Sequence, residues 1–280
     1  MKYKLNPIEI PPDNPFANDA LDRKESVESV AALIEELPGP FVLAINSPWG
    51  TGKTTFVKFV KTILEAKGIA CVYFSAWETD FASDPMIAFL GELEVAAKGF
   101  TGKKRTFKAN FDKVKSIASI IAKKAIPVAG KIATAGILDI SAFTEGAIAK
   151  LVEESINDVV SAYGKEKDLM EKFREKLAAS LDALTGNGNS SPVIIFVDDL
   201  DRCRPTYAIE LLERIKHLFD VENAIFVLSL DKQQLGVNLM AVYGQGINSN
   251  EYLRRFIDLE YLLPKTDSEK FTLNLFQRFG

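Results

Sequence analysis

Five short runs of mostly apolar residues are the most regular feature of this chain. They are FVLAIN (41–46), ACVYFSAW (70–77), PVIIFVDDLD (192–201), NAIFVLSLD (223–231) and, more weakly, IDLEYLLP (257–264). Such runs could be buried helix segments, but their length and β-branched content favour strands buried on both faces of a parallel sheet.

Segments with apolar residues at helical spacing separate these runs. Examples are residues 27–37, 54–68 and 210–219. Strands that alternate with helices predict an α/β fold, a parallel five-stranded sheet flanked by helices. Residues 86–190 break this alternation, because they show helical patterns and no strand pattern. We therefore expect a mostly helical insertion between the second and third strands.

The composition is that of a soluble domain with a large core. The chain has 280 residues, of which 47% are hydrophobic and 26% charged, and its net charge is -4. The N-terminus has no apolar run that could serve as a signal peptide. Cys71 and Cys203 have no metal-ligand spacing, so we expect reduced, buried thiols in a cytoplasmic protein.

The stretch NSPWGTGKTTFVKFV (46–60) resembles a phosphate-binding loop between a buried strand and a helix. Gly50 and Gly52 allow the backbone to approach a phosphate, Lys53 can reach the β- and γ-phosphates, and Thr54 can offer its hydroxyl to Mg²⁺. The pattern G-x-x-x-x-G-K-[ST] departs at its first position, where Ser47 stands; a small residue suits that corner if its φ is negative. The residues expected to hold the nucleotide are Ser47, Pro48, Trp49, Gly50, Thr51, Gly52, Lys53, Thr54 and Thr55.

Two other strands end in polar side chains that could serve the same site. The third run leads into Asp198, placed to orient Mg²⁺, and Asp199, placed to polarise an attacking water. The fourth run ends in Ser229 and Asp231, candidates for sensing the γ-phosphate. A capped strand end is the alternative for the latter pair.

The segments PWGTGKTT, FSAWETD, VDDLDRCRP, LSLD and EYLRRFIDLEYLLP, in this order, resemble the KAP P-loop NTPases. The residues that match the family pattern are Trp49, Phe74, Trp77, Asp198 to Arg202, Tyr252, Leu253 and Arg255. The resemblance covers roughly residues 20–265. Ser47 departs from the usual glycine, and Arg255 stands where the family has a lysine.

The resemblance implies ATP and Mg²⁺ as ligands, and ATP hydrolysis coupled to a conformational or assembly change. It implies a phosphate-loop strand flanked by the Walker B strand, which ends at Asp198, and by the sensor strand. Lys53, Asp199 and a trans-acting or sensor Arg255 are the expected catalytic residues, and Thr54 and Asp198 the Mg²⁺ ligands. Arg202 is expected to tie Asp201 or a neighbouring subunit. Many bacterial members appear in defence against phage and plasmids.

Two rival functions differ in class. A nucleotide-dependent binding module would hold ATP, hydrolyse it negligibly and recruit a partner protein, nucleic acid or membrane surface. The pair of carboxylates favours the enzyme, because binding needs only one. A small-molecule kinase would need an acceptor pocket, of which the sequence shows no sign. The absence of a GTPase-like base-reading motif after the fourth strand favours ATP over GTP.

We expect four regions along the chain. Residues 1–85 form the N-terminal half of the NTPase domain, 86–190 the helical insertion, and 191–265 the C-terminal half with the Walker B and sensor strands. Residues 266–280 read as the start of a further helical region, cut off by the end of the chain.

The insertion carries a concentrated positive charge. Residues 98–131 contain ten basic residues and one acidic residue, whereas the whole chain has a net charge of -4. Nucleic acid is one candidate partner, with Phe100, Phe107 and Phe111 as stacking platforms or as residues packed under the helix. No transmembrane segment is expected, because four charged residues, Lys123, Lys124, Lys131 and Asp139, interrupt the apolar stretch.

Two other interpretations of the basic segment remain. It could form a membrane-surface helix, with Ile117, Ile120 and Ile121 toward lipid. It could also meet an acidic face, such as the one around Glu153, Glu154 and Asp158, within the chain or between subunits. The last would fit an NTPase that self-associates.

Overall fold

The computed structural model describes residues 8–100, 104–124, 145–185 and 191–265, together with Thr272 and Phe276. In chain order the elements are η1 (Pro15–Asn18), α1 (Lys24–Glu36), β1 (Phe41–Asn46), α2 (Lys53–Ala66), β2 (Cys71–Ser75), α3 (Pro85–Ala97), α4 (Lys104–Lys124), α6 (Glu145–Leu184), β3 (Val193–Asp198), η3 (Leu200–Arg202), α7 (Pro205–Phe219), β4 (Ala224–Leu230), α8 (Lys232–Tyr243), α9 (Ser249–Leu253) and β5 (Leu259–Leu262). Each of the five apolar runs contains one of the strands.

The strands form one five-stranded parallel sheet, as predicted, and their order is β2-β3-β4-β1-β5. The expected neighbours of the phosphate-loop strand are partly wrong. The sensor strand β4 does lie beside β1, but β5 is on its other side, and the Walker B strand β3 lies beyond β4. All seven residues of β4 are buried, as expected for a strand with a neighbour on each side, whereas the weakly apolar β5 is half-exposed and suits an edge.

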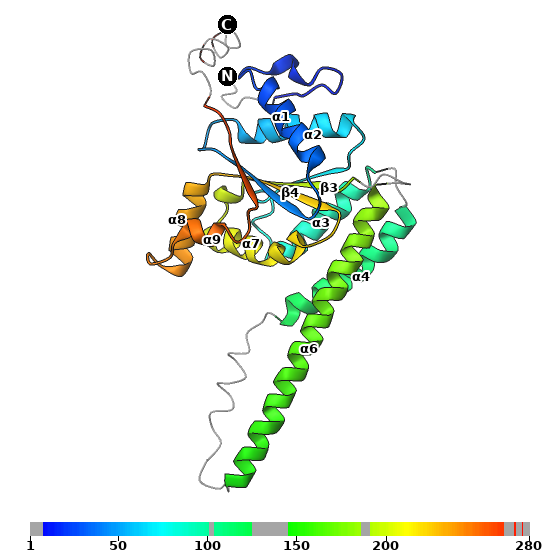
Figure 1. Ribbon diagram of the computed structural model, residues 1–280, viewed down its shortest axis with the longest axis vertical. Helices are drawn as coiled ribbons and strands as arrows, with labels where there is room; N and C mark the ends of the chain where they lie inside the picture. The colour runs from blue at the N-terminus through cyan, green and yellow to red at the C-terminus, as the bar shows by residue number, and fades with distance from the viewer. Residues whose placement is uncertain are drawn as a thin grey trace.

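Helices cover both faces of the sheet (Figure 1). On one face α1 and α2 bury Val27, Phe56 and Val60 against Leu43 and Ile45 of β1. The intervening residues of the strands point to the other face of the sheet, where α3, α7 and α8 pack against them. The phosphate loop joins β1 to α2. It therefore lies at the carboxyl ends of the parallel strands.

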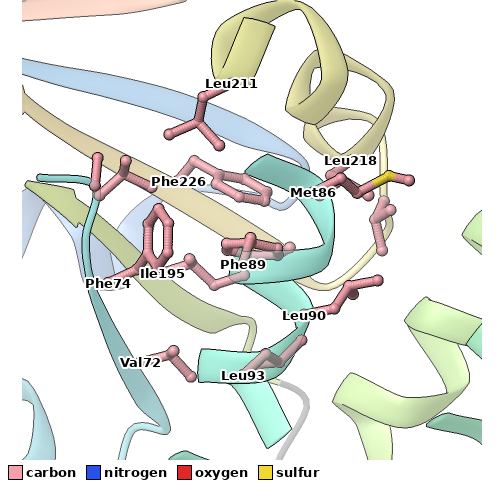
Figure 2. Close-up of a cluster of buried hydrophobic side chains, with 14 of the residues drawn as sticks. Val72, Phe74, Met86, Phe89, Leu90, Leu93, Ile195, Leu211, Leu218 and Phe226 are labelled. Atoms are coloured by element: carbon pink, nitrogen blue, oxygen red, sulfur yellow. The ribbon is translucent and has the colours of Figure 1, made fainter. Parts of the chain in front are cut away.

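Helix α3 belongs to the second of these layers. It begins at Pro85 because Asp84 caps it, accepting hydrogen bonds from the backbone N–H groups of Met86 (2.9 Å) and Ile87 (3.2 Å). Figure 2 shows its buried side chains between the sheet and α7, and the Phe89 ring stands edge-on to Phe74 at 5.5 Å. Within residues 86–190, then, the first helix packs on the sheet, and α4 and α6 follow it.

Helices α4 and α6 pack side by side and project away from the sheet (Figure 1). Near the sheet their contact is apolar. Buried side chains repeat at helical spacing on α4 and face those of α6; they are Phe107, Phe111, Val114 and Ala118 on α4, and Phe173, Leu177 and Leu181 on α6. No helix in the described ranges is long and apolar enough to cross a membrane.

Both cysteines are buried and unpaired, as predicted. The region 266–280 lies outside the described residues except for Thr272 and Phe276, so its predicted helical character stays a prediction. The side chains of Glu153, Glu154 and Asp158 and the whole of Lys131 also lie outside the described residues, so the predictions for them stay predictions.

Candidate nucleotide site

The loop between β1 and α2 has the backbone that a phosphate cradle needs. Gly50 and Gly52 have φ of 81° and 85°, which favour glycine, and a Cβ on Gly52 would lie 3.1 Å from Leu21 Cδ1. The described non-glycine residues with positive φ are Asp22, Asp199 and Asn223. Ser47 is not among them, so its side chain imposes no backbone strain at the first loop position.

Helix α2 begins directly after this loop, at Lys53. Gly52 is its N-cap residue and supplies no capping side chain. The first backbone N–H groups of the helix, around Thr54 and Thr55, are therefore left for an anion, which the positive end of the helix dipole favours. The predicted nucleotide-binding residues from Ser47 to Thr55 thus form the loop after β1 and the first turn of α2.

Lys53 is buried at the centre of the loop. Its ammonium group donates hydrogen bonds to the carbonyl oxygens of Ser47 (2.8 Å) and Pro48 (3.3 Å), and lies 3.8 Å from Asp201 Oδ2. In this arrangement the loop carbonyls occupy the ammonium group of Lys53. To reach a phosphate, the ammonium group must exchange these carbonyl contacts for phosphate oxygens.

Asp198 lies at the end of β3 and is fully buried. Its Oδ1 accepts the backbone N–H of Asp199 (2.9 Å), and its Oδ2 accepts the hydroxyl of Tyr73 (2.8 Å). Burial raises the pKa of Tyr73, and the charge of Asp198 raises it further, so the tyrosine remains a donor at neutral pH. Sequence reasoning missed Tyr73; its position two residues from the end of a parallel strand was the available signal.

Asp199 turns out of the strand in a left-handed conformation, with φ of 59° and ψ of 25°. Burial, and then the charge of Asp198, raise its pKa to about 6. Its Oδ1 lies 3.0 Å from Nε of Arg202. A carboxylate whose pKa is close to the working pH is suited to accept a proton from water.

The prediction that Arg202 ties Asp201 within the chain is wrong, because Arg202 pairs with Asp199 instead. Asp201 points toward the phosphate loop, where Oδ2 accepts the indole N–H of Trp49 and faces Lys53. Its Oδ1 is buried and has no hydrogen-bond partner among the described residues. The third acid of the DDLD segment therefore connects the Walker B turn to the loop.

The two sensor candidates differ in their surroundings. Ser229 is fully buried in β4, and its hydroxyl has no hydrogen-bond partner in the described part of the chain. Val197 of β3 pairs with Leu228, so the next residues along, Asp198 and Ser229, come close at the strand ends. Asp231 caps α8 by accepting the N–H groups of Gln233 (3.0 Å) and Gln234 (3.2 Å), and its predicted role toward the nucleotide stays a prediction.

A profile match decides the family. Residues 23–279 match the KAP family P-loop domain, which is nearly the whole chain. The chain belongs to the KAP family of P-loop NTPases. No curated protein sequence matches it.

One solved structure with a similar chain path is that of the ORC2 protein of Aeropyrum pernix in its ADPNP–ADP complexes, at 14% sequence identity and a TM-score of 0.42. The similarity covers 92% of this chain and 52% of that one, so the KAP chain spans about half the length of the ORC2 protein. A likeness this distant carries no conclusion about function.

The KAP site offers Mg²⁺ the donor atoms that it prefers. The Thr54 hydroxyl and the Asp198 carboxylate are oxygen ligands, and each Asp198 oxygen keeps lone pairs beyond its single hydrogen bond. No group of three or more His, Cys, Asp or Glu side chains in the described ranges could hold a metal ion alone. The residues therefore fit a Mg²⁺ that takes its other ligands from phosphates and water.

Arg255 is exposed and packs on an aromatic ring. Its guanidinium stands 5.5 Å from the ring centre of Tyr252. Three residues later Asp258 bonds the backbone of Val42, at the start of β1, whereas the loop follows the end of β1. No contact between Arg255 and the loop is present among the described residues, and its action on a neighbouring subunit stays a prediction.

The basic helix α4 keeps its charged residues outside and its aromatic residues inside. Lys104, Arg105 and Lys108 are exposed, whereas Phe107 and Phe111 are buried and stack on one another at 4.9 Å. Packing under the helix is therefore correct for Phe107 and Phe111, and their use as base platforms is wrong. Phe100 is half-buried against the same cluster.

Proposed function

We propose that this KAP protein binds ATP with Mg²⁺ at the phosphate loop and hydrolyses it, and that hydrolysis serves as a conformational or assembly switch. The observation that carries the proposal is Asp199. It lies next to a buried carboxylate, its pKa is raised to about 6, and its backbone turns it out of β3 at the end where the loop lies. A module that only binds nucleotide needs no such second acid.

Each residue has a role in this proposal. The loop backbone and the start of α2 hold the phosphates, and Lys53 moves from the loop carbonyls to the β- and γ-phosphates. Thr54 and Asp198 would hold Mg²⁺, which when bound neutralises phosphate charge. Asp199 accepts a proton from the attacking water, and the buried hydroxyl of Ser229, which has no hydrogen-bond partner among the described residues, would bond the γ-phosphate.

One observation favours the alternative of a binding module with negligible turnover. Arg202 holds Asp199 at 3.0 Å, and Asp201 holds both Lys53 and Trp49, so the resting site is tied within itself. If these contacts persist with ATP bound, Arg202 makes Asp199 a weaker base and Asp201 keeps Lys53 from the phosphates, so turnover would be slow. The protein would then use bound ATP to dock a partner protein, nucleic acid or a membrane surface.

Asp199→Asn separates the two functions. The variant should bind ATP as the wild type does and lose turnover, because an amide cannot accept the proton. Asp220→Asn makes the same change at an exposed carboxylate and should leave both unchanged. Turnover by Asp199→Asn at the wild-type rate would remove Asp199 from the reaction, and ATP binding without turnover in the wild type would favour the module.

A role in bacterial defence against phage and plasmids, in the cytoplasm, completes the proposal and rests on family membership. It predicts that cells expressing the wild-type protein plate phage less efficiently than cells expressing Lys53→Ala. Equal plating across a panel of phages, with both proteins present at the same level, would argue against antiviral defence.

A further inference from the structure

Tyr73 reaches from an edge strand of the sheet to the Walker B aspartate. It lies on β2, pairs in register with Phe196, and packs against the core on the α2 side. Ser75, two residues on, pairs with Asp198. Side chains two residues apart along neighbouring strands are diagonal neighbours, a gap that a tyrosine can span. Its hydroxyl closes this gap by donating to Asp198 Oδ2 at 2.8 Å.

This hydrogen bond fixes the direction of the Asp198 carboxylate. The backbone N–H of Asp199 holds Oδ1, and the Tyr73 hydroxyl holds Oδ2. With one donor at each oxygen, the plane of the carboxylate is set, and the remaining lone pairs keep one direction. Without the hydroxyl, one oxygen of a fully buried carboxylate would lose its donor, and the side chain could rotate to find another.

The tyrosine ring is itself held in place. The ammonium group of Lys58, on α2, lies 5.3 Å from the centre of the ring. Since α2 also carries the end of the phosphate loop, Tyr73 bridges the loop helix and the Walker B strand. The contact thus connects the two halves of the site that sequence motifs describe separately.

We propose that Tyr73 is a positioning residue that orients the Asp198 carboxylate toward the Mg²⁺ of the bound nucleotide. The proposal rests on the proposed function, because it assumes that Asp198 serves Mg²⁺. Tyr73 acts through Asp198 and does not touch the nucleotide itself. Its loss should therefore change the dependence on Mg²⁺ while leaving metal-free nucleotide binding unchanged.

The test compares Tyr73→Phe with the wild type by titrating Mg²⁺ into protein and a fluorescent ATP analogue. We expect the Mg²⁺ concentration at half-saturation to rise about tenfold, the size of a lost hydrogen bond to a buried charge. Affinity for the analogue in EDTA should not change. Tyr207→Phe is the matched control, because it removes another buried hydroxyl, one that bonds Thr79 at 3.1 Å instead of Asp198.

A double-mutant cycle with Asp198→Asn tests the route of the effect. If Tyr73 acts through Asp198, adding Tyr73→Phe to Asp198→Asn should shift the Mg²⁺ midpoint little further. Equal shifts with and without the aspartate would overturn the inference, as would a Tyr73→Phe variant with a wild-type Mg²⁺ midpoint. A wild-type protein whose nucleotide binding ignores Mg²⁺ would instead refute the metal-binding part of the proposed function.

Discussion

The guanidinium of Arg202 is paired with the carboxylate of Asp199, with Nε 3.0 Å from Oδ1. The same guanidinium lies 6.0 Å from the ring centre of Trp77. Its positive charge lowers the pKa of Asp199, against the larger effects of burial and of Asp198, which leave that pKa at about 6. The pair therefore sets the pH at which the proposed base becomes available.

Replacing Arg202 with glutamine should move the acid limb of the pH profile. A protonated Asp199 cannot accept a proton, so kcat/KM for ATP should fall as the pH drops through about 6. Without the guanidinium the anion is less stabilised, the pKa of Asp199 rises further, and the limb moves to higher pH. Arg204→Gln, whose arginine pairs with Asp80, should leave the limb in place. A limb at the same pH in both variants would contradict this role of Arg202.

Trp49 should report nucleotide binding by its fluorescence. It lies in the phosphate loop, half-exposed, and its indole donates to Asp201, which also faces Lys53. When Lys53 leaves the loop carbonyls for a phosphate, this cluster must rearrange. We expect tryptophan emission to change on addition of ATP and Mg²⁺, and the change to persist in Trp77→Phe and vanish in Trp49→Phe. Loss of the signal only in Trp77→Phe would place the rearrangement elsewhere.

Phe111→Ala should destabilise the contact between α4 and α6 near the sheet. Its ring is fully buried and stacked on Phe107, and removing such a ring costs about 3–5 kcal/mol of unfolding free energy. Denaturation followed by circular dichroism measures the loss. Phe81→Ala, at a side chain that is 88% exposed, should change the midpoint little. A wild-type midpoint for Phe111→Ala would mean that the ring is not part of the core.

The basic face of α4 makes a separate prediction. If it binds nucleic acid, reversing Lys104, Arg105 and Lys108 to glutamate should weaken binding strongly and flatten its dependence on salt. Filter binding of single-stranded and duplex DNA over a range of salt concentrations measures both effects.

A control variant with the same change in net charge distinguishes the effect of this face from the effect of the overall charge. Lys165, Lys167 and Lys172 are exposed on α6, and their reversal should weaken binding less. Equal losses from both triple variants would show that only overall charge matters. Unchanged binding in the α4 variant would remove nucleic acid as the partner of these three residues.

Much of the fold follows from local patterns. The apolar runs predict the strands because a strand buried on both faces has no room for polar residues, and Gly50 and Gly52 fall at the loop positions with positive φ. The order of the strands in the sheet cannot be predicted from these runs, because an apolar run does not indicate which strand pairs with it. The position of β4 between β1 and β3 depends on contacts between distant segments.

The site shows the same division. Lys53, Asp198 and Asp199 are recognisable because their motifs are contiguous in sequence. Tyr73 is not, since its role depends on a side chain that reaches from β2 to the end of β3. The Arg202 contact is local, three residues along from Asp199, but the motif does not specify which of its acids the arginine pairs with. Asp231 caps α8, which the sequence did not predict, and its contact with the nucleotide stays a prediction.

The central claim is that the loop beginning at Ser47 supports ATP turnover, and phosphate release from ATP by the purified protein tests it most directly. We predict Mg²⁺-dependent release that is lost in Lys53→Ala, which removes the buried ammonium group, and kept in Lys61→Ala, which removes a cation two turns along α2. Release at the same rate from the folded Lys53→Ala protein would contradict the account, because the activity would then arise outside the loop.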